Sequence, residues 1–169
     1  LGGGYKFQHD AQQAFDQAAL RAELRLRDKE YAKALQILEE FRSTAYSYSP
    51  IIKRQVVERE DAIRKSRALE ESTRATALDV QRQKLIESVQ DRIRIVEREF
   101  EEGSYRQALT NAEALLVQIQ RAKDEDYVKT NAACLHKVEG LWEQARASRK
   151  KVEDLVDRIR DSRRAADQL

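Results

Sequence analysis

The chain has 169 residues, of which 37% are charged and 41% hydrophobic, and it contains five glycines, one proline and one cysteine. This composition is too rich in helix-forming residues for a β protein, and the single cysteine excludes an internal disulfide framework. Thirty-two basic residues are interspersed with thirty acidic ones, so the net charge of +2 argues against a nucleic-acid-binding face. We expect an all-α protein of one domain or two small ones.

The first nine residues contain the run Gly2–Gly4, and we predict residues 1–9 to be a flexible tail. Alternatively, Tyr5–Phe7 are interfacial residues beside a removed transmembrane segment or signal. The chain has no Met and starts at Leu1, which we interpret as a fragment or a processed product. Its compartment is then either cytoplasmic or extracytoplasmic with the signal or anchor removed. No apolar run approaches the ~20 residues of a membrane span.

Three helices are predicted before the middle of the chain. Apolar residues recur at helical spacing from Asp10, which we predict to be the N-cap of a helix over residues 10–27. Asp28 is the predicted N-cap of a second helix, which ends at Tyr46–Pro50. Because the residue before a proline avoids the α conformation, Ser49 is the predicted N-cap of the third helix.

The third helix is predicted to be very long. No Gly or Pro occurs between Pro50 and Gly103, and an unbroken helix over residues 50–102 would span roughly 80 Å. Its middle, Arg64–Ala77, contains one large apolar residue and several i,i+4 ion pairs, which is typical of an exposed helix. The alternative is a break near Ser72–Thr73, where hydroxyl and β-branched residues cluster.

Two more helices are predicted after Gly103, which stands where a left-handed residue ends a helix. Ser104 is the predicted N-cap of the fourth helix, with a glutamine at capping-box spacing. The corner Lys123–Asp126 ends that helix, and its acidic residues favour the N-terminus of a fifth. Gly140 lies inside the fifth helix and predicts a kink or a close helix approach there.

A Tyr-x-x-Ala-Leu motif occurs twice, 74 residues apart, each time after a polar corner. The copies are Tyr31, Ala34 and Leu35 in the first and Tyr105, Ala108 and Leu109 in the second. Apolar positions of the preceding helices match at the same offset, whereas in the third segment the register slips by about two and aligns Ile51–Ile52 with Tyr127–Val128. The tyrosine would pack on the preceding helix, the alanine would allow close approach and the leucine would fill the groove. The alternative is chance agreement between two amphipathic helices.

These corners resemble the tetratricopeptide-repeat hairpin, in which Gly-x-Tyr-x-x-Ala-Leu joins two helices. Gly103–Leu109 fits that pattern, and Asp28–Leu35 fits it except that Lys29 stands in place of the glycine. The spacing of 74 residues departs from the family's repeat of about 34, the second helices are too long, and no proline ends each unit. The resemblance covers about half of the chain and implies a protein-interaction role without a ligand.

No pattern of catalytic or metal-ligating residues is found. His9 and His136 are the only histidines, and Cys134 points about 200° away from His136 on a helix. His136 with Glu139 is too small a ligand set, and Asp124–Asp126 lacks the glycine and further ligands of a calcium loop. Cys134 is interpreted as a small buried hydrophobe. No phosphate loop or serine elbow occurs, so we expect no enzyme, no cofactor and no metal.

The predicted fold is an elongated, all-α helical-hairpin repeat with a long central connecting helix. Its parts are a flexible tail (1–9), a first helical unit (10–70), a bridging part of the long helix (71–84) and a second unit with a C-terminal helical extension (85–169). Arg163–Arg164 and the polar end beyond them are expected to fray.

The leading functional hypothesis is a non-catalytic scaffold that binds another protein or self-associates, with no small-molecule substrate. Tyr31, Tyr105, Tyr127 and Trp142 are the candidate structural anchors, and Tyr46, Tyr48, Arg106 and Lys129 are the candidate partner contacts. One alternative is an extracytoplasmic spacer on a membrane-anchored protein, attached through a missing upstream segment. Another is weak nucleic-acid binding through the basic cluster Arg146, Arg149, Lys150 and Lys151.

Overall fold

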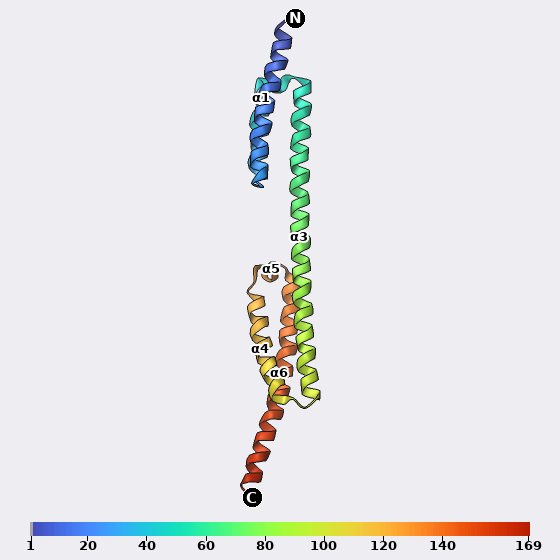
Figure 1. The fold of residues 1–169 in the computed structure, drawn as a ribbon, viewed down its shortest axis with the longest axis vertical. Helices are drawn as coiled ribbons and strands as arrows, with labels where there is room; N and C mark the ends of the chain where they lie inside the picture. Colours follow the sequence, from blue (N-terminus) through green and yellow to red (C-terminus); the bar gives the residue numbers. More distant parts are fainter. Residues whose placement is uncertain (1) are drawn as a thin grey trace. The chain divides into compact units, whose positions relative to one another are not determined.

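The computed structural model describes residues 2–169, and its residues are 91% helical, without a strand in the described range. The elements in chain order are α1 (Gly2–Arg27), α2 (Tyr31–Arg42), the 3₁₀ turn η1 (Ala45–Tyr48), α3 (Pro50–Glu101), α4 (Tyr105–Lys123), α5 (Asp126–Lys129) and α6 (Ala132–Asp167) (Figure 1). The all-α prediction is therefore confirmed. The predicted continuous helix is also confirmed, because α3 runs through Ser72–Thr73 without a break.

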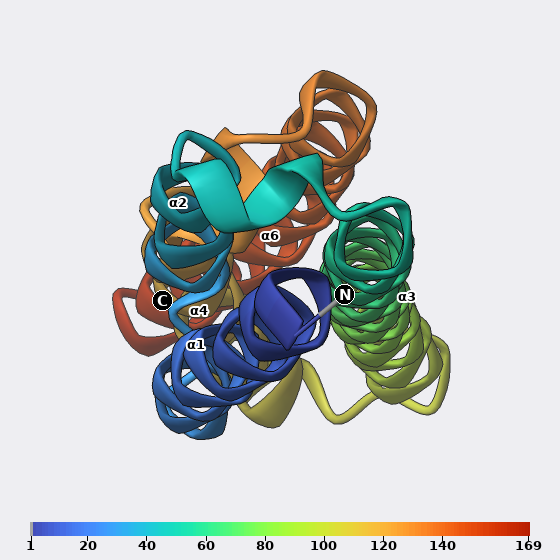
Figure 2. The ribbon, with the colours of Figure 1, turned by 90° about the horizontal axis from the view of Figure 1, so that it is seen from above.

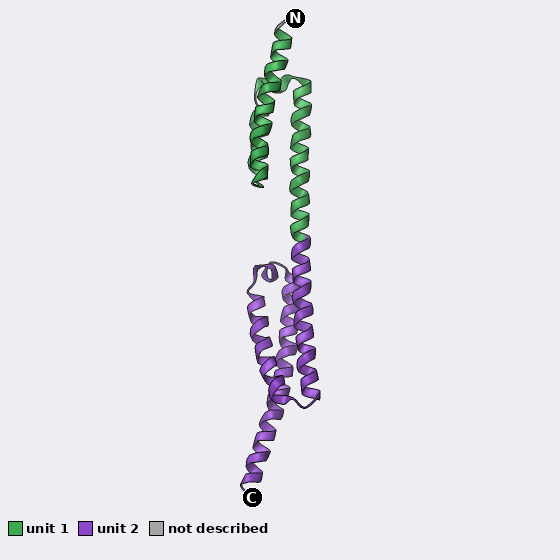
Figure 3. Ribbon diagram, viewed as in Figure 1, with its two compact units in different colours: residues 1–75 green, residues 76–169 purple. Residues whose placement is uncertain are grey.

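The chain divides into two compact units, Leu1–Ala75 and Thr76–Leu169 (Figure 3). Unit 1 contains α1, α2, η1 and the first part of α3. Unit 2 contains the last part of α3 together with α4, α5 and α6. Each unit therefore consists of a helical hairpin and a third helix, and α3 serves both.

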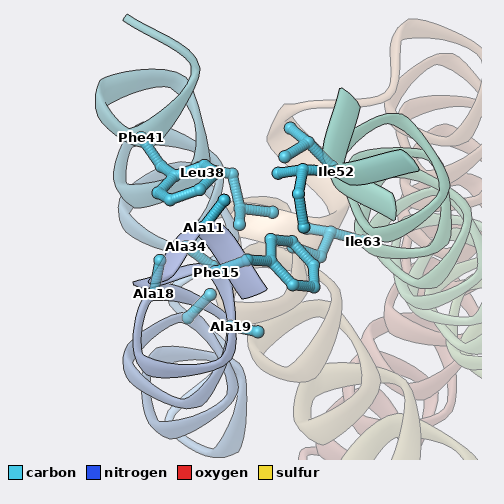
Figure 4. Packing of buried hydrophobic residues seen from close by; sticks show 11 residues of the cluster. Ala11, Phe15, Ala18, Ala19, Ala34, Leu38, Phe41, Ile52 and Ile63 are labelled. Atoms are coloured by element: carbon cyan, nitrogen blue, oxygen red, sulfur yellow. The ribbon is translucent and has the colours of Figure 1, made fainter. Parts of the chain in front are cut away.

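The core of unit 1 lies between α1, α2 and the first part of α3. Figure 4 shows Phe15 of α1 and Leu38 of α2 pointing toward Ile52 and Ile63 of α3. The ring of Phe15 meets the ring of Phe41 edge-on, with centroids 5.8 Å apart. Close approach of α1 and α2 is possible because four facing residues are alanines, Ala11, Ala18, Ala22 and Ala34. Each buried leucine or isoleucine contributes about 1.5–3 kcal/mol to folding.

The first helix begins earlier than the sequence predicts. Asp10 is not an N-cap, because α1 already starts at Gly2. The early turns have tertiary partners: the ring of Phe7 lies 6.0 Å from that of Tyr46, and the Ser49 hydroxyl donates to Gln8 at 2.7 Å. Residues 2–9 of the predicted flexible tail are thus helical, and Leu1 lies outside the described residues.

The two hairpin corners have the same backbone geometry. Lys29 and Gly103, 74 residues apart, both have positive φ angles, +58° and +85°. The amide of Lys29 donates to Leu26 O (2.9 Å), as that of Gly103 does to Phe100 O (3.2 Å). The next amide in each corner donates five residues back, at 3.0 Å and 2.8 Å, which completes a Schellman motif. The left-handed residue predicted at Gly103 is confirmed, and Lys29 adopts it without being glycine.

The predicted caps of α2 and α4 need correction. Glu30, not Asp28, is the N-cap residue of α2, because the Schellman corner carries the chain two residues further before the helix begins. Ser104 is the N-cap residue of α4, as predicted, but its side chain makes no capping hydrogen bond, so the capping box is absent.

The third helices start at equivalent caps 82 residues apart. The amide of Ile52 donates to Ser49 Oγ at 3.5 Å, and that of Cys134 donates to Asn131 Oδ1 at 2.9 Å. The predicted slip of about two residues is therefore wrong, and the slip from 74 to 82 is eight. The predicted fifth helix is in fact two, α5 and α6, since Asn131 caps a new start. Most of the slip comes from α4, which has 19 residues where α2 has 12.

The core of unit 2 has two clusters. One contains Ile86, Val89 and Ile93 of α3 with residues of α4, α5 and α6, and the other surrounds Val152 at the hairpin corner. Gly140 lies within the continuous helix α6, and a Cβ atom there would have no neighbour within 4 Å. The predicted close approach at Gly140 is therefore wrong. Among residues 2–169, none of the helices combines the length and the apolar character that a membrane crossing requires.

Candidate protein-binding groove

A groove of about 750 Å³ lies in unit 2, where the start of α4 passes the C-terminal part of α6. Its lining combines apolar side chains with four arginines and one acidic residue. The lining residues are Gly103, Ser104, Tyr105, Arg106, Gln107, Val156, Ile159, Arg160, Arg163, Arg164 and Asp167.

The corner at Gly103 holds one wall of the groove in place. The positive φ of this glycine turns the chain so that Tyr105 starts α4, and the ring of Tyr105 meets that of Phe100 edge-on at 5.6 Å. Val152 of α6 is buried in the same cluster, and the Lys151 ammonium lies 4.5 Å from the Phe100 ring centroid. The opposite wall is α6, which continues from this cluster to Asp167.

The groove has an excess of uncompensated positive charge. Arg160 pairs with Asp157 at 3.1 Å and with Asp161 at 3.9 Å. Arg106, Arg163 and Arg164 form no ion pair with any residue in the range 2–169. Because charges within about 8 Å are only partly screened at physiological salt, these three guanidinium groups give the groove a positive potential.

The α6 wall of the groove contains a four-residue sequence that also occurs in α3, where it packs against α4. Asp157–Arg160 is identical to Asp91–Arg94 of α3, and both carry the same internal ion pair, at 3.1 Å and 2.7 Å. In α3, Ile93 is only 6% exposed, in a cluster with Leu115 of α4, and Arg92 donates to Gln118 of α4. In α6, the equivalent Ile159 lines the open groove.

Sequence reasoning missed this wall of the groove. It interpreted Arg163–Arg164 as the start of a fraying end, but α6 is helical to Asp167. The second Asp-Arg-Ile-Arg segment was the sequence signal that could have revealed this wall. It repeats, on a part of α6 that no hairpin covers, the side chains with which α3 packs against α4.

The four predicted partner contacts belong to different units, and only the two in unit 2 can be compared with the groove. Arg106 lines the groove, whereas Lys129 ends α5, which follows the opposite end of α4. Tyr46 and Tyr48 belong to unit 1; the ring of Tyr46 packs on Phe7, and Tyr48 is 83% exposed. Only Arg106 therefore belongs to the candidate groove.

The motif tyrosines differ in what they contact. Ala34 and Ala108 are fully buried in the two hairpins, and Leu35 and Leu109 are half-buried beside them. Tyr105 packs on Phe100. Tyr31, by contrast, donates a hydrogen bond from its hydroxyl to the carboxylate of Glu70 in α3.

The Tyr31–Glu70 hydrogen bond moves both pKa values. It lowers the pKa of Glu70 below its ordinary 4.5, and the nearby Lys29 ammonium, 3.3 Å from the carboxylate, lowers it further. It also raises the pKa of Tyr31 above its ordinary 10.0, because the carboxylate stabilises the protonated hydroxyl.

The other predicted anchors, Trp142 and Tyr127, make contacts within unit 2. Trp142 lies beside Lys123 and Arg146, 5.9 Å and 5.5 Å from its ring centroid. The carbonyl of Tyr127 accepts from Arg82 at 2.6 Å, and burial raises the pKa of the Tyr127 hydroxyl. Cys134 is a free, buried thiol, as the sequence predicts.

Two of the four residues of the predicted basic cluster, Arg146 and Arg149, have acidic neighbours within ion-pair distance. Arg149 pairs with Glu113 at 3.6 Å and with Glu153 at 3.8 Å, and Arg146 lies 3.9 Å from Glu143. These partners weaken the case for a nucleic-acid surface here.

Within residues 2–169, no three side chains of His, Cys, Asp or Glu are grouped so that they could hold a metal ion. The chain has no match among protein-family models, curated protein sequences or solved structures.

Proposed function

We propose that this protein is a non-catalytic helical scaffold whose unit 2 groove binds an acidic amphipathic helix of another protein. The proposal rests on a comparison of the two copies of the Asp-Arg-Ile-Arg segment. The copy in α3 packs against α4, whereas Ile159 and Arg160 of the copy in α6 line an open groove. The recurrence of one hairpin corner in both units supports a scaffold, and the tetratricopeptide-like character stays a prediction.

A helix suits the apolar part of the groove. Val152, Val156 and Ile159 are spaced i, i+4 and i+7, which places them on one face of α6. Val152 is covered by the hairpin corner, and the other two continue its stripe into the groove. An apolar stripe of this kind accepts the complementary stripe of a second helix.

An acidic partner suits the charged part. Arg106, Arg163 and Arg164 surround the stripe without internal partners, and Asp167 is the acidic residue of the lining. Ion pairs at such a rim contribute modestly to affinity but strongly to partner choice and association rate. We expect a dissociation constant on the order of 10 μM, because the groove is small for a protein interface.

The test uses a fluorescein-labelled peptide of about 18 residues, five helical turns, with Leu at helical spacing and Glu elsewhere. Fluorescence anisotropy should show binding to the full chain, and the double variant Arg163→Glu/Arg164→Glu should bind at least about tenfold more weakly. Lys137→Glu is the matched control, since Lys137 is exposed on the same helix outside the groove. It should leave the affinity within about twofold.

Two results would overturn the proposal. One is an absence of binding at millimolar peptide. The other is equal binding by the double variant and the wild type, which would place the peptide elsewhere on the chain. A concentration-dependent dimer in sedimentation velocity, abolished by the same double variant, would instead assign the groove to self-association.

A further inference from the structure

One end of unit 1, here called the tip, lacks acidic residues. It comprises residues 2–9 at the start of α1 and residues 43–54, which form the link and the start of α3. Figure 2 shows this end of unit 1 end-on, and Figure 1 shows that the first turns of α1 extend past η1 and the start of α3. The two segments contain Lys6, Lys53 and Arg54 but no Asp or Glu, although the chain has thirty acidic residues.

The tip is a built surface and not a set of unrelated segments. Phe7 of α1 packs on Tyr46 of η1, and the hydroxyl of Ser49 donates to Gln8. Ser47 is buried, and its hydroxyl donates to the carbonyl oxygens of Arg42 and Thr44, at 2.7 Å and 2.9 Å. These contacts hold the start of α1 against the link.

Large apolar and aromatic side chains project from this surface. Tyr5 is 81% exposed, Tyr48 83% and Ile51 58%. Lys6, Lys53 and Arg54 are exposed in the same two segments, and none forms an ion pair within the part of the chain that the structure describes. The surface therefore presents tyrosines and an isoleucine among unneutralised cations.

The corresponding link of unit 2 has the opposite character. It carries three consecutive acids, Asp124–Asp126, and it buries Val128 and half-buries Tyr127. Exposed aromatics and an absence of acids are thus not requirements of this three-helix arrangement. They are particular to unit 1.

We propose that the tip docks reversibly on the surface of an anionic lipid bilayer. Tyrosine partitions favourably to the headgroup region, where its ring is in an apolar layer and its hydroxyl is hydrated. Tyr5, Tyr48 and Ile51 enter this region, and Lys6, Lys53 and Arg54 face lipid phosphates. Three cations are few for a nucleic-acid site, in which affinity comes mainly from phosphate contacts. The inference is independent of the groove in unit 2.

The test is co-flotation of the full chain with two kinds of vesicle, phosphatidylcholine alone and phosphatidylcholine with about one-third phosphatidylglycerol. At low salt the bound fraction should be at least about fivefold higher on the anionic vesicles, and the excess should disappear at high salt.

Two double variants separate the contributions. Lys53→Gln/Arg54→Gln should remove most of the preference for anionic vesicles. Tyr48→Ser/Ile51→Ser should reduce binding while keeping the salt dependence. Leu69→Ser is the matched control, since Leu69 is 69% exposed on α3 outside the tip, and it should leave flotation unchanged.

The proposal is overturned if the chain floats equally with both vesicles, or with neither. It is also overturned if Leu69→Ser reduces flotation as much as the tip variants, or if a single-stranded oligonucleotide displaces the chain from vesicles and binds through Lys53 and Arg54 instead. Circular dichroism of each variant verifies that the helices are retained.

Discussion

The two units share one arrangement of helices but differ in the chemistry of the third helix. At the offset of 82 residues, the buried Val56 and Ile63 of unit 1 correspond to the buried Val138 and Ala145 of unit 2. At two other equivalent positions the residues of the two units differ in chemical character. Glu60 corresponds to Trp142, and Glu70 corresponds to Val152.

The first mismatch is a buried charge against an aromatic ring. Glu60 is 4% exposed and accepts from Arg42 at 2.7 Å and from Arg64 at 3.3 Å. A buried carboxylate requires such partners, because an unpaired charge away from water is strongly unfavourable. Trp142 has no such requirement and provides apolar area. Unit 1 therefore uses an ion-pair network where unit 2 uses an aromatic side chain.

The second mismatch lies at the hairpin corners. In unit 1, Glu70 joins Tyr31 and Lys29 in a polar contact, and in unit 2 the buried Val152 packs in the cluster of Phe100 and Tyr105. Lys29, which occupies the left-handed position of the unit 1 corner, has its ammonium 3.3 Å from the Glu70 carboxylate. In unit 2 the equivalent corner is apolar at this position.

The largest expected effect comes from placing in unit 2 the glutamate that unit 1 has at the equivalent position, Glu70. Val152→Glu should lower the free energy of unfolding of unit 2 by roughly 3 kcal/mol, because Gly103 offers no cation to the buried carboxylate. Urea denaturation followed by the fluorescence of Trp142, the single tryptophan, measures it. Leu69→Glu, at an exposed site, should stay within about 0.5 kcal/mol, and a loss below about 1 kcal/mol for Val152→Glu would contradict the comparison.

The corner residues provide a second test. Gly103→Ala should destabilise unit 2 by about 1–2 kcal/mol, because its φ of +85° disfavours a side chain. Lys29→Ala should have a much smaller effect on unit 1, since the residue there already carries a Cβ atom at φ +58°. Thermal unfolding by circular dichroism compares the two variants, and equal losses would contradict the assignment of the Gly103→Ala loss to a Cβ atom at positive φ.

Gly140 offers a stabilising substitution. Its equivalent in unit 1 is Glu58, a good helix former, and a Cβ atom at Gly140 would meet nothing within 4 Å. Gly140→Ala should therefore raise the stability of unit 2 by about 1 kcal/mol. Trp142 fluorescence in urea measures this as well, and a destabilised variant would show that the glycine has a packing role.

The smallest effect concerns the Tyr31–Glu70 contact and its pH dependence. The pKa of Glu70 is lowered in the folded chain. Its contribution to the free energy of unfolding is therefore present above about pH 4.5 and is lost as the pH falls below that value. The pKa of Tyr31 is raised, so its contribution is present below about pH 10 and is lost at higher pH.

Tyr31→Phe should therefore lower the melting temperature slightly between these limits and by a smaller amount at pH 3. The equivalent Tyr105→Phe should show no such pH dependence in the acid range, because Tyr105 faces Phe100 and not a carboxylate. A difference between wild type and Tyr31→Phe that persists unchanged at pH 3 would contradict the assignment.

Much of this fold could be predicted from local sequence signals. The continuity of α3, the cap at Ser49 and the left-handed Gly103 follow from the absence of breakers, from a proline and from a glycine. Lys29 could not be predicted to adopt a left-handed conformation, because residues other than glycine rarely do, and its ion-pair partner lies 41 positions later in the sequence. The start of α1 could not be predicted either, because Phe7 and Gln8 contact Tyr46 and Ser49, which lie about 40 residues later in the sequence.

The candidate groove was only partly predictable. Arg106 was chosen as an exposed cation, but its association with Ile159 and Arg163 depends on where α6 passes the corner. The register of α6 was misjudged because the extra length of α4 and the cap at Asn131 shift it by eight residues.

The most direct test of the account is a chemical-shift map of the acidic helical peptide on isotope-labelled protein. The account predicts that amide shifts concentrate at Gly103–Gln107 and at Val156–Asp167, and that Arg163→Glu/Arg164→Glu abolishes them while Lys137→Glu does not. Shifts confined to other surfaces, or none at saturating peptide, would contradict the claim that unit 2 is built to receive a partner helix.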